Sequence, residues 1–174
     1  MTVKRALTIL MAALAFLGTG AAATAADQVI FLVRHAEKAA TAAPAPGKMM
    51  ADDPPLSAEG HARATRLAAL LASADVKHIF TTEYLRARQT AAALSERTNV
   101  PVVMSAANDP DPLVQQVRKA AGNVLIVGHS NTLPDLLKRL GVTQAITIAD
   151  SEYDNLFVVV RHGAGPPTLI RLRY

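Results

Sequence analysis

The sequence predicts an α/β fold, a three-layer sandwich with a mostly parallel central sheet, helices on both faces and a C-terminal β-hairpin. Short apolar runs rich in β-branched residues alternate with segments of helical periodicity, which is typical of a parallel sheet covered on both faces. Near the C-terminus this alternation stops, and two strand-like runs flank a turn rich in Gly and Pro at residues 163–167. A length of 174 residues suits one domain.

The first predicted strand, residues 28–33, is a β-branched run that ends directly before Arg34 and His35. Residues 39–55 form the longest stretch without periodicity and are predicted as a loop. Ser57 is a suitable N-cap for a helix that runs to about residue 73. The inner face of this helix is predicted to carry Leu67, Leu70 and Leu71.

The remaining elements follow in alternation. Strands are predicted at residues 76–81, 100–104 and 124–127, helices at 84–98, 113–121 and 132–140, and hairpin strands at 155–161 and 168–173. Pro101 indicates that the third strand lies at a sheet edge, because proline has no N–H to donate to a neighbouring strand.

Residues 1–25 have the pattern of a secretory signal peptide. A short positive start precedes an apolar run at residues 6–17, and small residues surround Ala25. The alternative is a membrane anchor, but this run is shorter than the roughly 20 residues that span a bilayer. We therefore expect cleavage after Ala25 and one domain over residues 26–174. The absence of cysteine favours secretion into a bacterial periplasm.

Composition excludes several classes of function. Without the two basic residues of the signal peptide the net charge falls from +4 to +2, so a basic surface for nucleic acid is not expected. No later segment is apolar enough to bind a membrane as a span. Zero cysteines exclude thiolate catalysis and Cys-zinc sites. The oligomeric state is not indicated.

Charged side chains follow three of the predicted parallel strands where each strand ends. Arg34 and His35 follow the first strand, Arg86 follows the second and His129 follows the fourth. The carboxyl ends of parallel strands meet at one edge of a sheet, so these side chains should lie together. Because guanidinium groups offer paired donors to phosphate oxygens, the sequence predicts a phosphate pocket there.

His35 suits the chemistry of phosphate transfer. A neutral imidazole is a nucleophile near pH 7 and can hold a phosphoryl group covalently, which splits hydrolysis into two easier steps. The arginines would stabilise the charge of the phosphoryl group as it moves. We therefore expect neither a metal nor another cofactor.

Four segments resemble the motifs of the histidine phosphatase superfamily, which is related to phosphoglycerate mutase. They are residues 32–37 (LVRHAE), 55–60 (PLSAEG), 84–91 (YLRARQTA) and 127–130 (VGHS). The compact chain is similar to the short branch that contains phosphohistidine phosphatases. The resemblance implies that His35 is the phosphorylated nucleophile. It also implies that Arg34, Arg86 and His129 complete the phosphate pocket.

The chain departs from the family pattern at two points. Ala36 replaces the usual glycine after the nucleophile. Ser130 stands where some branches carry an aspartate that protonates the leaving group, so Asp109 and Asp111 are the candidate acids. Their alternative role is ordinary Asp-Pro turn chemistry. Glu37 is assigned to the phosphate site as a residue that organises the arginines.

Arg161-His162-Gly163 matches the family's Arg-His-Gly letters, but a Gly/Pro turn and a strand follow it, so we expect a hairpin turn. The sequence thus predicts a metal-independent phosphatase that hydrolyses phosphomonoesters through phosphohistidine on His35. The alternatives are a phosphotransferase and a phosphate-binding protein with little turnover. The substrate would be a small phosphorylated molecule under a roof formed by residues 39–55, or a phosphoprotein at a shallower site.

Overall fold

The computed structural model describes residues 27–40, 53–163 and 165–174. The predicted signal peptide, residues 1–25, lies outside the described residues, as do residues 41–52 of the predicted loop. In the described part of the chain, no helix has the length and apolar character needed to cross a membrane.

The elements alternate as the sequence predicts. They are β1 (Gln28–Arg34), α1 (Ala58–Leu71), β2 (Val76–Thr82), α2 (Leu85–Thr98), β3 (Val102–Ser105), α3 (Asp111–Lys119), β4 (Asn123–Gly128), α4 (Leu133–Arg139), β5 (Asn155–Arg161) and β6 (Thr168–Arg173). The bounds differ from the predicted ones by a few residues at most, and the two hairpin strands coincide with the prediction.

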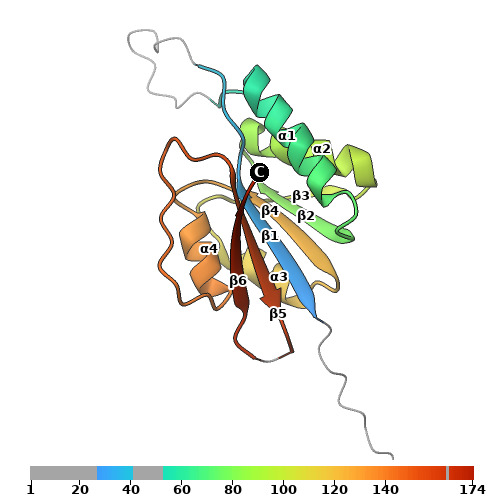
Figure 1. The fold of residues 1–174 in the computed structure, drawn as a ribbon, viewed down its shortest axis with the longest axis vertical. Helices are drawn as coiled ribbons and strands as arrows, with labels where there is room; N and C mark the ends of the chain where they lie inside the picture. Colours follow the sequence, from blue (N-terminus) through green and yellow to red (C-terminus); the bar gives the residue numbers. More distant parts are fainter. Residues whose placement is uncertain (1–26, 41–52, 164) are drawn as a thin grey trace, which may run out of the picture.

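One sheet holds all six of these strands in the order β3-β2-β4-β1-β5-β6 (Figure 1). The first four are parallel, and β5 runs antiparallel to both β1 and β6. The predicted C-terminal hairpin is therefore confirmed as an extension of a parallel sheet. β3 lies at the other edge, as Pro101 indicated.

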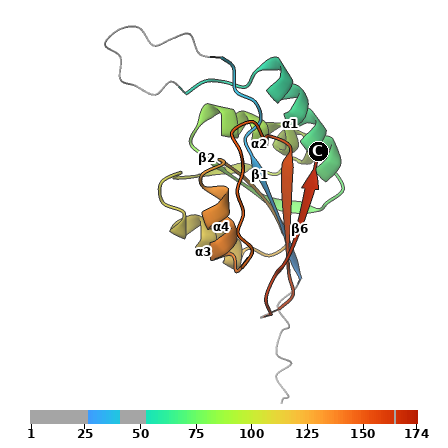
Figure 2. The same ribbon diagram turned by 60° about the vertical axis from the view of Figure 1, so that its left-hand side comes forward.

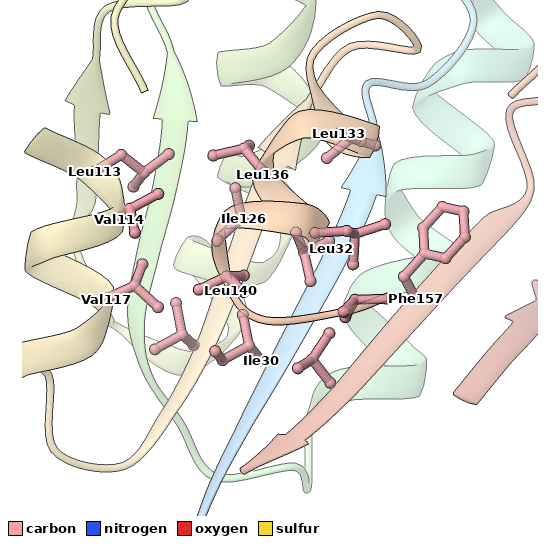
Figure 3. Close-up of a cluster of buried hydrophobic side chains, with 14 of the residues drawn as sticks. Ile30, Leu32, Leu113, Val114, Val117, Ile126, Leu133, Leu136, Leu140 and Phe157 are labelled. Carbon is pink, nitrogen blue, oxygen red and sulfur yellow. The ribbon is translucent and has the colours of Figure 1, made fainter. Parts of the chain in front are cut away.

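Helices cover both faces of the sheet, with α1 and α2 on one side and α3 and α4 on the other (Figures 1 and 2). Strand β1 shows why, because its side chains alternate between the two layers. Ile30 and Leu32 pack in the cluster under α3 and α4, whereas Val33 packs in the cluster under α1 and α2. Figure 3 shows the first of these clusters.

Helix α1 begins as predicted, since the Ser57 side chain accepts a hydrogen bond from the Gly60 N–H at 3.1 Å. Leu67 and Leu71 are buried, but the prediction for Leu70 was wrong, because it is 54% exposed. The buried stripe of α1 widens toward Ala68, which leaves position 70 on the opposite flank of the stripe.

The Arg161-His162-Gly163 segment lies in the hairpin turn, as predicted. The Nδ1 atom of His162 is 3.1 Å from a carboxylate oxygen of Asp27, the residue that precedes β1. Because Asp27 precedes β1 and His35 follows it, His162 lies at the opposite end of that strand from His35.

Candidate active site

The two histidines meet because β1 and β4 are neighbours in register. Arg34 is paired with Gly128, so the next residue of each strand, His35 and His129, leaves the sheet at the same level. The His35 N–H donates to the Gly128 carbonyl at 2.9 Å. The ring centroids are 5.1 Å apart in an edge-on arrangement, and the residues are 4% and 7% exposed. The predicted meeting of the strand exits is thus observed.

The contacts of His35 define its tautomer. The Arg86 Nε–H group lies 3.2 Å from Nε2 of His35, and a guanidinium can only donate. Nε2 therefore accepts with its lone pair, and Nδ1 carries the proton that is donated to the Ala36 carbonyl at 2.8 Å. Consequently the unprotonated nitrogen faces the cationic side of the site.

The protonation state of His35 agrees with this tautomer. Burial above all, together with electrostatic interactions with His129, Arg86 and Arg34, lowers its pKa from 6.5 to about 3, against the hydrogen bond to the backbone of Ala36. The imidazole is therefore neutral at pH 7, which is the nucleophilic form.

Arg86 stands in the first turn of α2, directly after the exit of β2. Its Nη1 lies 3.3 Å from a carboxylate oxygen of Asp53, and its guanidinium carbon is 4.4 Å from the centre of the Tyr84 ring. Both oxygens of Asp53 also accept the Leu85 N–H at 2.9 Å. Asp53 thus fixes the helix start and the arginine together.

Arg34 is held from the segment before β5. Its Nη1 donates to the carbonyls of Ala149, Asp150 and Glu152 at 3.2, 2.8 and 3.2 Å. Its guanidinium carbon is 4.0 Å from the centre of the Tyr153 ring. Among the described residues, Nε of Arg34 is one of the buried side-chain atoms without a hydrogen-bond partner, which leaves a donor for a ligand.

His129 bonds to the last residue of β2. Its Nε2 lies 2.8 Å from the Thr82 hydroxyl, and the Tyr84 ring packs edge-on at 5.1 Å. Burial and the charges of Arg86 and Arg34 lower its pKa from 6.5 to about 4, while Glu83 and Asp53 oppose the shift. The second imidazole is therefore also neutral at pH 7.

Glu37 lies outside this cluster of contacts. Its carboxylate accepts from Nε of Arg63 at 2.8 and 2.9 Å and from Nη2 at 2.5 Å. Burial raises the pKa of Glu37, but the hydrogen bonds from Arg63 outweigh it and leave the pKa lowered. Glu37 does organise an arginine, but that arginine is Arg63 of α1 and not Arg34 or Arg86.

The candidate acids Asp109 and Asp111 are engaged near the start of α3. Asp111 forms an ion pair with Arg139 of α4, and Asp109 accepts the Asp111 N–H at 3.3 Å. The structure gives neither aspartate a contact with His35 or His129.

Sequence reasoning missed four residues whose side chains contact the side chains of Arg34, Arg86 or His129, namely Asp53, Thr82, Tyr84 and Tyr153. Thr82 and Tyr84 flank the β2 exit, where a search for hydrogen-bonding side chains would have found them. A cavity of about 280 Å³ lies beside His129, with Tyr84, Arg86 and His129 in its wall. In residues 27–40, 53–163 and 165–174, no group of three or more His, Asp or Glu side chains is arranged to hold a metal ion.

Comparisons with known proteins agree with this geometry. Residues 30–107 match the model of the histidine phosphatase superfamily (branch 1), a span that includes His35 and Arg86. No curated protein sequence matches the chain.

Solved structures share the fold over most of their length. The protein histidine phosphatase SixA complexed with tungstate has 18% identity and a TM-score of 0.65, with 83% of this chain and 96% of that chain covered. A mycobacterial glucosyl-3-phosphoglycerate phosphatase has 16% identity and a TM-score of 0.62, covering 83% and 97%. The phosphoglycerate mutase of Plasmodium falciparum has 17% identity and a TM-score of 0.55, covering 84% and 90%. These structures show the fold of this chain, and the match of residues 30–107 to the histidine phosphatase model agrees with it.

Proposed function

We propose that the chain is a metal-independent phosphatase that hydrolyses phosphomonoesters through a phosphohistidine intermediate on His35. One observation carries the proposal. The Nε2 lone pair of a buried, neutral His35 is 3.2 Å from the Arg86 guanidinium. A nucleophile and a cation are thus presented to the same ligand.

The reaction would proceed in two transfers. Nε2 of His35 attacks phosphorus, the bond from phosphorus to the ester oxygen breaks, and that oxygen takes a proton from a general acid and leaves as an alcohol. Water then attacks phosphorus and returns a proton to that group, the P–N bond breaks, and phosphate leaves. Arg86 and the free Nε–H of Arg34 would bind the phosphoryl oxygens.

The second histidine would act on the same phosphoryl group. A phosphate dianion bound beside His129 would offset the charges of Arg86 and Arg34 and raise the pKa of the ring, which then donates a hydrogen bond to a phosphoryl oxygen. Asp109 and Asp111 stay predictions as proton donors to the leaving group, and their contacts near α3 weigh against that role.

Turnover and the intermediate test the proposal. Wild type should release phosphate from p-nitrophenyl phosphate and retain acid-labile label after a quench with radioactive substrate, whereas His35→Ala should do neither. His61→Ala, on the exposed face of α1, is the matched control and should behave as wild type. Equal rates for wild type and His35→Ala would remove His35 from the mechanism. Label retention without phosphate release would favour a phosphotransferase, and phosphate binding with neither would favour a binding protein.

Export is a separate proposal that rests on residues 1–25 alone. A mature N-terminus at Ala26 in the periplasmic fraction of a bacterial host would support it. Retention of the full chain in the cytoplasm would contradict it.

A further inference from the structure

A second cavity adjoins the one beside His129. It also measures about 280 Å³ and lies between α3 and α4. Four residues line both cavities, namely Ala107, Asn108, Asn131 and Thr132. Thr82, whose hydroxyl bonds to His129, is a further wall residue of the second cavity. The two spaces are thus neighbours that share one wall.

The inner wall of the second cavity is apolar. Leu113 of α3, Ile126 of β4 and Leu136 of α4 line it, and Figure 3 shows these three side chains facing one another between the two helices. Each is buried in the cluster on that face of the sheet. A ligand that enters this space therefore exchanges water for hydrocarbon contacts.

The charges at the cavity do not suit a second anionic group. Among the described residues, Arg139 is the only Lys or Arg that lines this cavity. Its guanidinium is paired with both Asp111 and Asp135. Asp135 itself lines the cavity. A carboxylate or second phosphate placed here would meet a carboxylate and no free cation, which disfavours nucleotides and phosphorylated acids.

We propose that the cavity between α3 and α4 receives the uncharged, apolar leaving group of a phosphomonoester whose phosphate is bound at His35 and His129. This inference rests on the proposed function and names its substrate class. The cavity volume of about 280 Å³ lies just below the roughly 300–1,000 Å³ of typical small-molecule sites, so the leaving group that it holds should be small. A short alkyl or single aromatic group is the expected occupant, which excludes a phosphoprotein side chain attached to a bulky backbone.

Two homologous series test the proposal separately from turnover. The dissociation constants of methyl-, ethyl-, propyl- and butylphosphonate report on the cavity without hydrolysis, and kcat/KM for the matching alkyl phosphates reports on the reaction. Each methylene that leaves water should tighten binding about fourfold, so butylphosphonate should bind about sixtyfold more tightly than methylphosphonate. kcat/KM should rise in parallel.

Ala107→Leu fills the wall that the two cavities share, and the Ala107 N–H can still donate to Glu83. It should reduce the butyl-to-methyl ratio of affinities to within about threefold of unity, because the added side chain takes the space of the alkyl chain. Ala62→Leu, on the exposed face of α1, is the matched control and should keep the wild-type ratio.

The outcomes separate the two proposals. Equal affinities across the series, or a wild-type ratio in Ala107→Leu, would overturn the cavity assignment even if all esters were hydrolysed. A sixtyfold ratio without hydrolysis would support the cavity and contradict the phosphatase. If the protein neither binds phosphonates nor hydrolyses the esters, both proposals are overturned.

Discussion

Acid should destabilise this protein through His35 in a calculable way. The residue is 4% exposed, and its pKa falls from 6.5 in the unfolded chain to about 3 in the folded one, chiefly through burial. Between these values the unfolded chain binds more protons. The stability that this group contributes is therefore complete above pH 6.5 and declines as the pH falls toward 3.

The size of the effect follows from the two pKa values. A pKa unit corresponds to about 1.4 kcal/mol, so lowering the pH from 8 to 5 should cost about 2 kcal/mol through His35 alone. Urea unfolding at the two pH values measures the loss. His35→Asn cannot titrate, so its loss over the same interval should be smaller than that of wild type by about 2 kcal/mol.

The matched control is His61→Asn, an exposed substitution on α1 that should keep the wild-type pH dependence. Nitrogen chemical shifts of the His35 ring provide a second readout, with Nδ1 protonated and Nε2 unprotonated at pH 7. An identical loss in wild type and His35→Asn, or a His35 that titrates near 6.5, would refute the argument from burial.

Three further variants test contacts that support the site. Gly60→Ala would place a Cβ 2.1 Å from the carbonyl oxygen of Glu37, so unfolding in urea should show a loss of about 3 kcal/mol. Arg63→Ala removes the partner of the half-buried Glu37 carboxylate and should cost about 1–3 kcal/mol in the same assay; unchanged stability would contradict the pairing. Thr82→Val keeps the shape but removes the hydroxyl that bonds to His129, so kcat/KM should fall about tenfold to a hundredfold and stability should fall by about 1–3 kcal/mol.

The cluster of His35, Arg86 and His129 was largely predictable because local signals fixed it. Strand ends are visible in the sequence, and the carboxyl ends of parallel strands share an edge whatever their order, so His35, Arg86 and His129 were expected together. The register that pairs Arg34 with Gly128 adds precision to this expectation but does not change it.

Apart from the edge position that Pro101 indicated for β3, strand order could not be predicted, and it accounts for the placement of Asp109 and Asp111. Periodicity marks strands without ranking them in the sheet. β3 lies at the edge, three places from β1, which at about 4.8 Å per strand is roughly 14 Å. Its exit therefore leads toward α3 and the apolar cavity, where Asp111 meets Arg139.

The partners of Arg34 were hidden for a related reason. β5 runs antiparallel to β1, so the segment before β5 reaches the same end of the sheet as His35. Tyr153 and the three carbonyls of residues 149–152 come to Arg34 only through this docking of the hairpin. The hairpin signal in the sequence does not say which sheet edge the hairpin joins.

In the proposed mechanism the two guanidiniums would have linked effects on substrate and nucleophile. Arg34 and Arg86 attract a phosphate dianion, and the same positive charges add to burial in lowering the pKa of His35. The groups proposed to bind the substrate thus add to burial in keeping His35 unprotonated. Once the dianion is bound, it offsets those charges, so a neighbouring imidazole such as His129 can gain a proton when the phosphoryl group needs a donor. Loss of either arginine should therefore weaken binding and also leave the nucleophile easier to protonate, so its effect on kcat/KM should grow as the pH falls.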